Sequence, residues 1–176
     1  NKTGGLKTDA TVTLTGGTIN LGSVTGAIGV YVNTGRVFDT GSTITVGNNG
    51  IGIYAKDADL SLNGTIIKLH GNNTLGMYLE GNTNLLTGNG TIDINAVLFY
   101  MNTAPLTTIN NNFTVTSTPG STYTLGSIKG GAFDYSGSSI LASNGTLVSG
   151  ENSAVYLNGS TITAPGATNV AAVALD

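Results

Sequence analysis

Apolar and polar residues alternate in short segments that recur along the chain, each centred on a tyrosine. The first four segments are residues 27–32, 50–55, 74–79 and 96–101, with Tyr31, Tyr54, Tyr78 and Tyr100 at the same local position. Apolar residues stand on both sides of each tyrosine, as Val30 and Val32 do around Tyr31. Successive side chains of a strand point to opposite faces, so inward apolar residues predict outward tyrosines.

The spacing of these segments predicts the architecture. The tyrosines return after 23, 24 and 22 residues, and each period holds two more strand-like pieces, such as 59–62 and 66–69, separated by turn signals such as Asn63-Gly64. Three short strands in about 22–24 residues form one rung of a three-faced solenoid, so we expect an all-β, right-handed parallel β-helix. Asn-Gly pairs also suit two-residue hairpins, which makes an antiparallel sandwich the alternative fold.

The pattern changes after Tyr100. The next matching segments place Asp134, Tyr156 and Ala174 in the tyrosine position, and Asp134 follows Tyr100 by 34 residues. That distance exceeds one rung, which predicts an excursion from the coil around residues 105–130. We otherwise interpret residues 1–176 as a single β-helix segment of a longer protein.

Composition supports a folded, strand-rich chain and excludes several kinds of site. The 176 residues are 39% hydrophobic, 9% charged and include 27 glycines, which favours strands and turns over helices or disorder. Cysteine is absent, which excludes disulfides and thiolate sites. A net charge of −3 with six basic residues argues against nucleic acid or anionic membrane as a partner, and no apolar run approaches the roughly 20 residues of a membrane-spanning helix.

The charged residues do not form a recognisable catalytic or metal-binding pattern. Asp57 and Asp59 share one turn, which gives too few oxygen ligands for calcium, and His70 is the sole histidine. Lys68 and Asp93 are expected at equivalent outward positions on neighbouring rungs, as a surface pair. We therefore predict no enzymatic reaction, cofactor or metal. A β-helical lyase or glycosidase remains the alternative and requires carboxylates gathered in space.

The outward tyrosines form the candidate surface for a ligand or partner. Tyrosine is favoured at interfaces because its ring is large and its hydroxyl is polar, and flat aromatic rings suit sugars. A lectin-like module is thus a second alternative function. In-register tyrosines also stack on one another and stabilise aligned strands, which would make the same column a structural seam. The residues concerned are Tyr31, Tyr54, Tyr78, Tyr100 and Tyr156.

Three segments carry a resemblance to a known family. They are residues 48–54 (Asn-Asn-Gly-Ile-Gly-Ile-Tyr), 72–78 (Asn-Asn-Thr-Leu-Gly-Met-Tyr) and 150–156 (Gly-Glu-Asn-Ser-Ala-Val-Tyr). Together with the low charge and absent cysteine, they resemble the passenger regions of type V autotransporters, most closely the large fusobacterial adhesins. The resemblance covers most of the chain from about residue 10, and 105–130 is its weakest part.

The resemblance implies a location and a set of partners. It implies a bacterial cell-surface or extracellular segment, anchored through an outer-membrane barrel outside this chain and exported through the periplasm. Such a segment extends the passenger and presents surfaces for attachment to proteins or glycans of host cells or other bacteria. Because the rungs at the ends of a cut solenoid are open, we also expect end-to-end self-association of the isolated segment.

Overall fold

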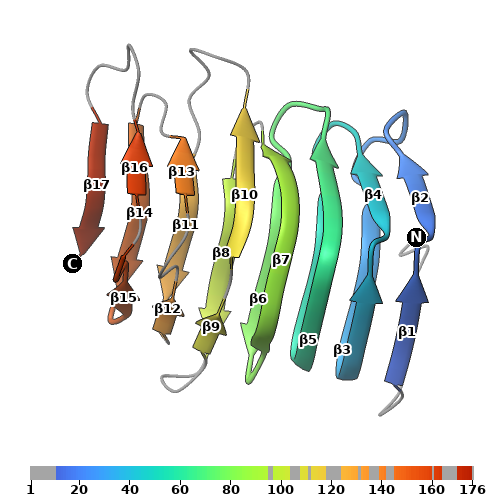
Figure 1. Ribbon diagram of the computed structural model, residues 1–176, viewed down its shortest axis with the longest axis horizontal. Helices are drawn as coiled ribbons and strands as arrows, with labels where there is room; N and C mark the ends of the chain where they lie inside the picture. Colours follow the sequence, from blue (N-terminus) through green and yellow to red (C-terminus); the bar gives the residue numbers. More distant parts are fainter. Residues whose placement is uncertain are drawn as a thin grey trace.

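The protein is a parallel β-solenoid, in which the chain coils around a long axis and each rung stacks on the one before it (Figure 1). The computed structural model describes residues 11–94, 97–103, 108–110, 112–117, 124–130, 132–134, 139–141, 145–159, 161–163 and 170–175. These residues form strands and turns without a helix, and the paired strands run parallel. The predicted parallel β-helix is confirmed, and the antiparallel sandwich is excluded.

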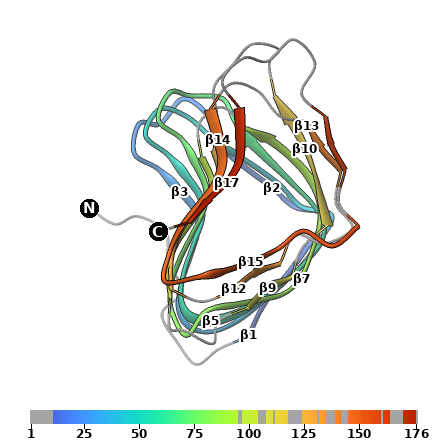
Figure 2. The same ribbon diagram turned by 90° about the vertical axis from the view of Figure 1, so that its left-hand side faces the viewer.

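Viewed along its axis, the coil has three faces (Figure 2). The tyrosine face contains the beginnings of β3 (Ile28–Thr40) and β5 (Ile51–Leu69), followed by whole strands from the later rungs. Those strands are β6 (Leu75–Gly81), β8 (Val97–Thr103), β11 (Thr124–Lys129), β14 (Gly145–Glu151) and β17 (Val170–Leu175). All seven segments are joined by parallel pairing from one rung to the next.

The other two faces are built in the same way from the remaining strands. The second face holds the end of β3, the middle of β5 and the start of β7 (Asn84–Ile94), with β1 (Thr11–Thr15), β9 (Thr108–Asn110), β12 (Ala132–Asp134) and β15 (Ala154–Tyr156). The third face holds the ends of β5 and β7, with β2 (Thr18–Leu21), β4 (Thr43–Val46), β10 (Asn112–Ser117), β13 (Ser139–Leu141) and β16 (Thr161–Thr163).

Alternating apolar residues from the three faces fill the inside of the coil. Their side chains are at most 3% exposed, and they are Val32, Val37, Ile44, Val46, Ile53, Ala55, Ala58, Leu60, Leu62, Ile67, Leu69, Met77, Leu79, Leu85 and Ile92. Each position repeats one rung later, as in the pairing of Ile53 with Met77. Burying a Leu or Ile side chain contributes roughly 1.5–3 kcal/mol, so this repeated core is what holds the rungs together.

The corners between the faces are made by residues with left-handed backbone. Between the third face and the tyrosine face, Gly26, Asn49 and Asn73 have φ values of 70°, 54° and 53°. Glycine and asparagine enter this region at the lowest cost, which explains why the Asn-Asn pairs precede the tyrosine segments. The asparagines also bond along the axis, because Asn73 Nδ2 donates to Asn49 Oδ1 at 3.3 Å.

The segment 105–130, for which the sequence predicts an excursion, contains three strands that pair within the coil. β9 pairs with β7 and β12, β10 pairs with β7, and β11 pairs with β8 and β14. Residues 104–107, 111 and 118–123 lie outside the described residues. The rung that runs from Tyr100 to its partner Ser127 spans 27 residues, which places the extra length between β10 and β11.

Candidate partner surface on the tyrosine face

Three consecutive rungs place a tyrosine at the same position of the tyrosine face, and the rings stack. The ring centroids of Tyr31 and Tyr54 are 5.0 Å apart with an interplanar angle of 16°, and those of Tyr54 and Tyr78 are 5.1 Å apart at 14°. Backbone pairing continues from Tyr78 to Tyr100. We call Tyr31, Tyr54 and Tyr78 the tyrosine ladder. Its spacing is close to the distance of about 4.8 Å between paired strands, so strand pairing sets the stack.

The stacking decides which part of each ring is presented to a partner. Tyr54 has Tyr31 against one ring face and Tyr78 against the other. All three side chains are half-buried, and stacking covers ring faces rather than ring edges. A sugar ring binds an aromatic residue mainly through the flat face of that residue, and both faces of Tyr54 are already covered.

Glycines beside the ladder allow the rungs to approach. A Cβ atom on Gly52 would lie 2.6 Å from the carbonyl oxygen of Gly76 and 2.9 Å from Cγ2 of Ile67. Gly29 is equivalent, since its Cβ would meet Gly52 O at 2.6 Å. The repeated Gly-x-Tyr element of the first three rungs therefore has a steric cause in the close contact between backbones.

A polar column runs along the ladder two residues after each tyrosine. In backbone register it reads Asn33, Lys56, Glu80, Asn102, Lys129 and Glu151. Lys56 Nζ lies 3.2 Å from Glu80 Oε1, and Lys129 Nζ lies 3.5 Å from Glu151 Oε2. This column is not among the site residues predicted from the sequence, although its signal is local. Residues two apart on a strand share a face, so each residue two positions after a tyrosine must flank the ladder.

The ladder and the polar column are connected through Glu80. The Tyr54 hydroxyl donates a hydrogen bond of 2.5 Å to Glu80 Oε2, while Lys56 contacts the other carboxylate oxygen. Burial, together with the hydrogen bond to the Glu80 carboxylate, raises the pKa of Tyr54 well above its ordinary value. Tyr54 is consequently held as a neutral phenol whose proton points at a carboxylate.

Tyr156 and Asp134 do not belong to the ladder, so this part of the sequence prediction is wrong. Tyr156 pairs with Asp134, and Asp134 pairs with Asn110, on the second face. The tyrosine position beyond Tyr100 is instead held by Ser127, Ser149 and Ala174, the last as predicted. In that rung β14 already occupies the tyrosine face, and Asn152 with φ 50° turns the chain before Tyr156.

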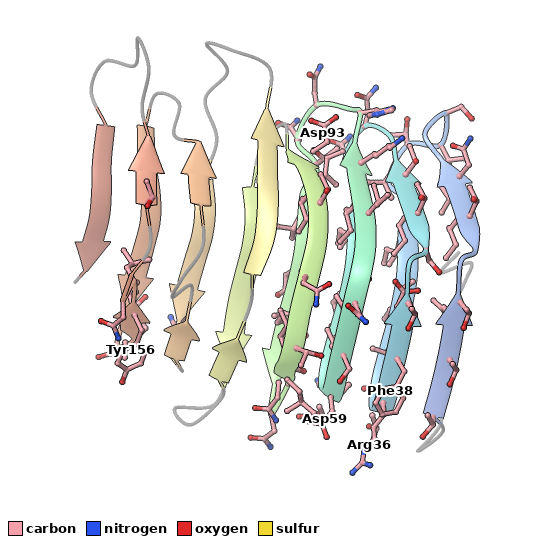
Figure 3. All side chains as sticks on the ribbon, viewed as in Figure 1. Arg36, Phe38, Asp59, Asp93 and Tyr156 are labelled. Atoms are coloured by element: carbon pink, nitrogen blue, oxygen red, sulfur yellow. The ribbon has the colours of Figure 1, made fainter. Side chains whose placement is uncertain are left out.

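The second face carries an outward strip of apolar and charged side chains. Phe38 is 41% exposed, Leu86 50% and Tyr156 48%. Arg36 Nε lies 3.7 Å from Asp59 Oδ2, and Asn84 Nδ2 donates to Asp59 Oδ1 at 3.2 Å. Figure 3 shows Arg36, Phe38, Asp59 and Tyr156 along one side of the coil, with Asp93 on the opposite side. Asp93 pairs in register with Lys68 on the third face, as the sequence predicts.

One carboxylate lies inside the coil. Asp39 is 2% exposed, and its Oδ2 accepts hydrogen bonds from the Thr65 hydroxyl and from the Ser42 amide at 3.4 Å. Its Oδ1 has no hydrogen-bond partner among the described residues. Within that same part of the chain, no three His, Asp or Glu side chains gather as a metal-binding group.

Comparison with known proteins gives no relative for this chain: no protein-family model, no curated protein and no solved structure matches it. Among the described residues, no helix is long and apolar enough to span a membrane.

Proposed function

We propose that this chain is a structural segment of a bacterial surface adhesin of the autotransporter type, which extends the passenger and holds its binding surfaces in a fixed orientation. The observation that carries the proposal is the tyrosine ladder, whose rings stack at 5.0 and 5.1 Å across three rungs. Both flat faces of the central ring, that of Tyr54, are covered by neighbouring rings and are not available to a ligand. This arrangement suits a seam that keeps rungs in register.

The dimensions of the coil agree with a spacer. Seven segments pair in succession on the tyrosine face, from β3 to β17. At about 4.8 Å for each rung, the six steps between them span roughly 29 Å. Each rung contacts only its neighbours, so a solenoid of this kind lengthens by adding rungs without changing its cross-section. A rigid rod is the physical requirement for presenting a distant attachment site.

Surface display tests the proposal with the complete chain. The chain is inserted between an outer-membrane autotransporter barrel and a cell-binding module of known target. We expect export to the surface, where the module is accessible on intact cells and still supports attachment. The chain displayed without the module should add no attachment to host cells or to other bacteria. Failure of the chain to reach the surface would overturn the proposal.

Two further outcomes distinguish the alternatives. If the chain alone supports saturable attachment that the pair Tyr54→Ser and Tyr78→Ser abolishes, the ladder is a lectin-like or receptor-binding surface. Phe38→Ser with Leu86→Ser is the matched control, because those exposed apolar side chains lie on the second face. Release of oligosaccharides from a polysaccharide panel would instead identify an enzyme.

A further inference from the structure

We propose that the tyrosine ladder is an oxidative cross-linking site, at which a one-electron oxidant joins Tyr54 to Tyr31 or Tyr78 through a carbon–carbon bond between neighbouring rungs. The proposal concerns the chemistry of the ladder and does not depend on the proposed function. Two geometric features support it: rings stacked at 5.0 and 5.1 Å, and a tyrosine hydroxyl that donates to a carboxylate at 2.5 Å.

The hydrogen bond makes Tyr54 the favoured position for the first oxidation. Removing an electron from a phenol makes its hydroxyl strongly acidic, so oxidation is easier where a base already holds the proton. Glu80 Oε2 occupies that position, at the short distance typical of a bond to an ionised acceptor. Lys56 Nζ, 3.2 Å from Glu80 Oε1, places a positive charge beside the same carboxylate. Glu80 is thus a positioning and proton-accepting residue for Tyr54.

The stack supplies the second reactant. Coupling needs two tyrosyl radicals close together, and the fixed neighbours replace a bimolecular encounter by an intramolecular one. With centroids 5.0 and 5.1 Å apart and interplanar angles of 16° and 14°, each ring lies next to its partner in the folded chain. Bond formation then requires the half-buried rings to turn out of the stack, so that the carbons beside the two hydroxyl-bearing carbons meet edge to edge.

The reaction balances as a two-electron oxidation. Each of two tyrosines loses one electron to the oxidant and one phenolic proton, which Tyr54 gives to Glu80 and its neighbour gives to solvent. The two radicals form one carbon–carbon bond between ring carbons, and the two displaced ring hydrogens move to the phenol oxygens. The product is a dityrosine, lighter by two hydrogen atoms. The oxidant is external and belongs to the class of one-electron oxidants, such as peroxide-activated haem or photogenerated ruthenium(III).

The consequence for this chain is a covalent link between rungs that disulfides cannot supply, because cysteine is absent. A bond between Tyr54 and Tyr78 closes a loop of one rung in the unfolded state. A cross-link of that length stabilises the folded state by restricting the unfolded chain, as a disulfide of equal span does.

Photochemical oxidation of the folded chain with a ruthenium(II) complex and persulfate tests the proposal. Trypsin then cuts after Arg36, Lys56, Lys68 and Lys129, so each link joins two identifiable peptides. We expect monomeric product in which peptide 37–56 is joined to 8–36 or to 69–129, with the mass of two hydrogens lost. Tyr54→Phe should abolish these links, and Tyr156→Phe should leave them unchanged. Denaturing the chain before illumination should also abolish them.

Two further variants separate the ladder from a general effect on folding. Tyr31→Phe combined with Tyr78→Phe keeps the Tyr54 to Glu80 pair but removes the partners, and it should also abolish both links. Glu80→Gln keeps the shape but cannot accept the proton, so links should form more slowly. Links of peptide 37–56 that persist in the Tyr31→Phe and Tyr78→Phe double variant, or a folded wild-type chain without links in peptide 37–56, would overturn the proposal. An unchanged rate in Glu80→Gln would reject the role of Glu80.

Discussion

The Tyr54 hydroxyl and the Glu80 carboxylate come from successive rungs and are joined by a hydrogen bond of 2.5 Å. The contact joins a ladder residue of one rung to a polar-column residue of the next rung. It therefore holds the two rungs in register independently of the backbone pairing of their strands. Lys56 extends the contact back to the first of these rungs through Glu80 Oε1. A one-residue slip of either strand would break both bonds, which makes the pair a register device as well as a stabilising contact.

The same pair predicts a loss of stability at alkaline pH. The pKa of Tyr54 is raised in the folded chain, so the unfolded chain loses this proton first as the pH rises past about 10. The stability that neutral Tyr54 contributes is therefore complete below that pH and decreases above it. Because solvent screens this half-exposed side chain, the slope stays below the limit of about 1.4 kcal/mol for each pH unit.

Urea unfolding of wild type and Tyr54→Phe across pH 9 to about 11 measures this dependence. Other tyrosines and lysines titrate in both proteins, so the informative quantity is the difference between the two curves. Wild type should lose more stability than the variant as the pH rises. Two parallel curves would show that ionisation of Tyr54 does not contribute to the pH dependence of stability.

The backbone beside the ladder leaves no room for a side chain at Gly52. Gly52→Ala places a Cβ atom 2.6 Å from Gly76 O and 2.9 Å from Ile67 Cγ2, and both contacts are shorter than real Cβ atoms tolerate. We expect a loss of about 1–3 kcal/mol in the free energy of unfolding. Gly17→Ala is the matched control, because its Cβ would lie 3.6 Å from Ser42 Oγ, and it should stay within about 0.5 kcal/mol of wild type. Equal effects of the two substitutions would contradict the steric argument.

Substitution of the corner asparagines should reduce stability for a different reason, which is their left-handed backbone. Asn49 has φ 54°, its amide donates to Asn72 O at 2.9 Å, and its Oδ1 accepts from Asn73. Asn49→Val should cost about 1–2 kcal/mol, because a β-branched residue is strained in left-handed backbone. Asn49→Gly keeps the conformation and loses only the side-chain bond, so its cost should be smaller. Thermal unfolding of both variants measures the difference, and a Gly variant as unstable as the Val variant would argue against backbone strain as the cause.

Most of the fold follows from the sequence because the repeat and the strand alternation are both local signals. The nearly equal spacing of Tyr31, Tyr54 and Tyr78 predicts the length of one rung. The alternation within residues 50–55 predicts which side chains point into the core. Ile51 is only half-buried, however, because the neighbouring Gly52 faces the core at Ile67. The simple alternation of inward and outward residues fails beside Gly52, which has no side chain.

The register of the rungs after Tyr100 could not be predicted from the tyrosine motif alone. Residues 150–156 look like another tyrosine segment, yet Gly145–Glu151 is the strand that occupies the tyrosine face of that rung. Ser127 and Ser149 hold the tyrosine position without an aromatic ring, so a search for tyrosine passes over them. Register is set by pairing along the whole coil, and a local match cannot report which face of the rung it occupies.

Tyr54 and Tyr156, which the sequence treats as equivalent, should respond very differently to truncation. Tyr54 is stacked on both sides and bonded to Glu80, whereas Tyr156 is 48% exposed on the second face. Tyr54→Ala removes two stacked contacts and the hydrogen bond to Glu80 Oε2, so we expect a loss of about 2–4 kcal/mol in the free energy of unfolding. Tyr156→Ala should cost about 1 kcal/mol or less. Denaturant unfolding of both variants measures the contrast, with Tyr54→Phe separating the hydrogen bond from the stack. If both alanine variants lost equal stability, the ladder would not be the seam that aligns the rungs.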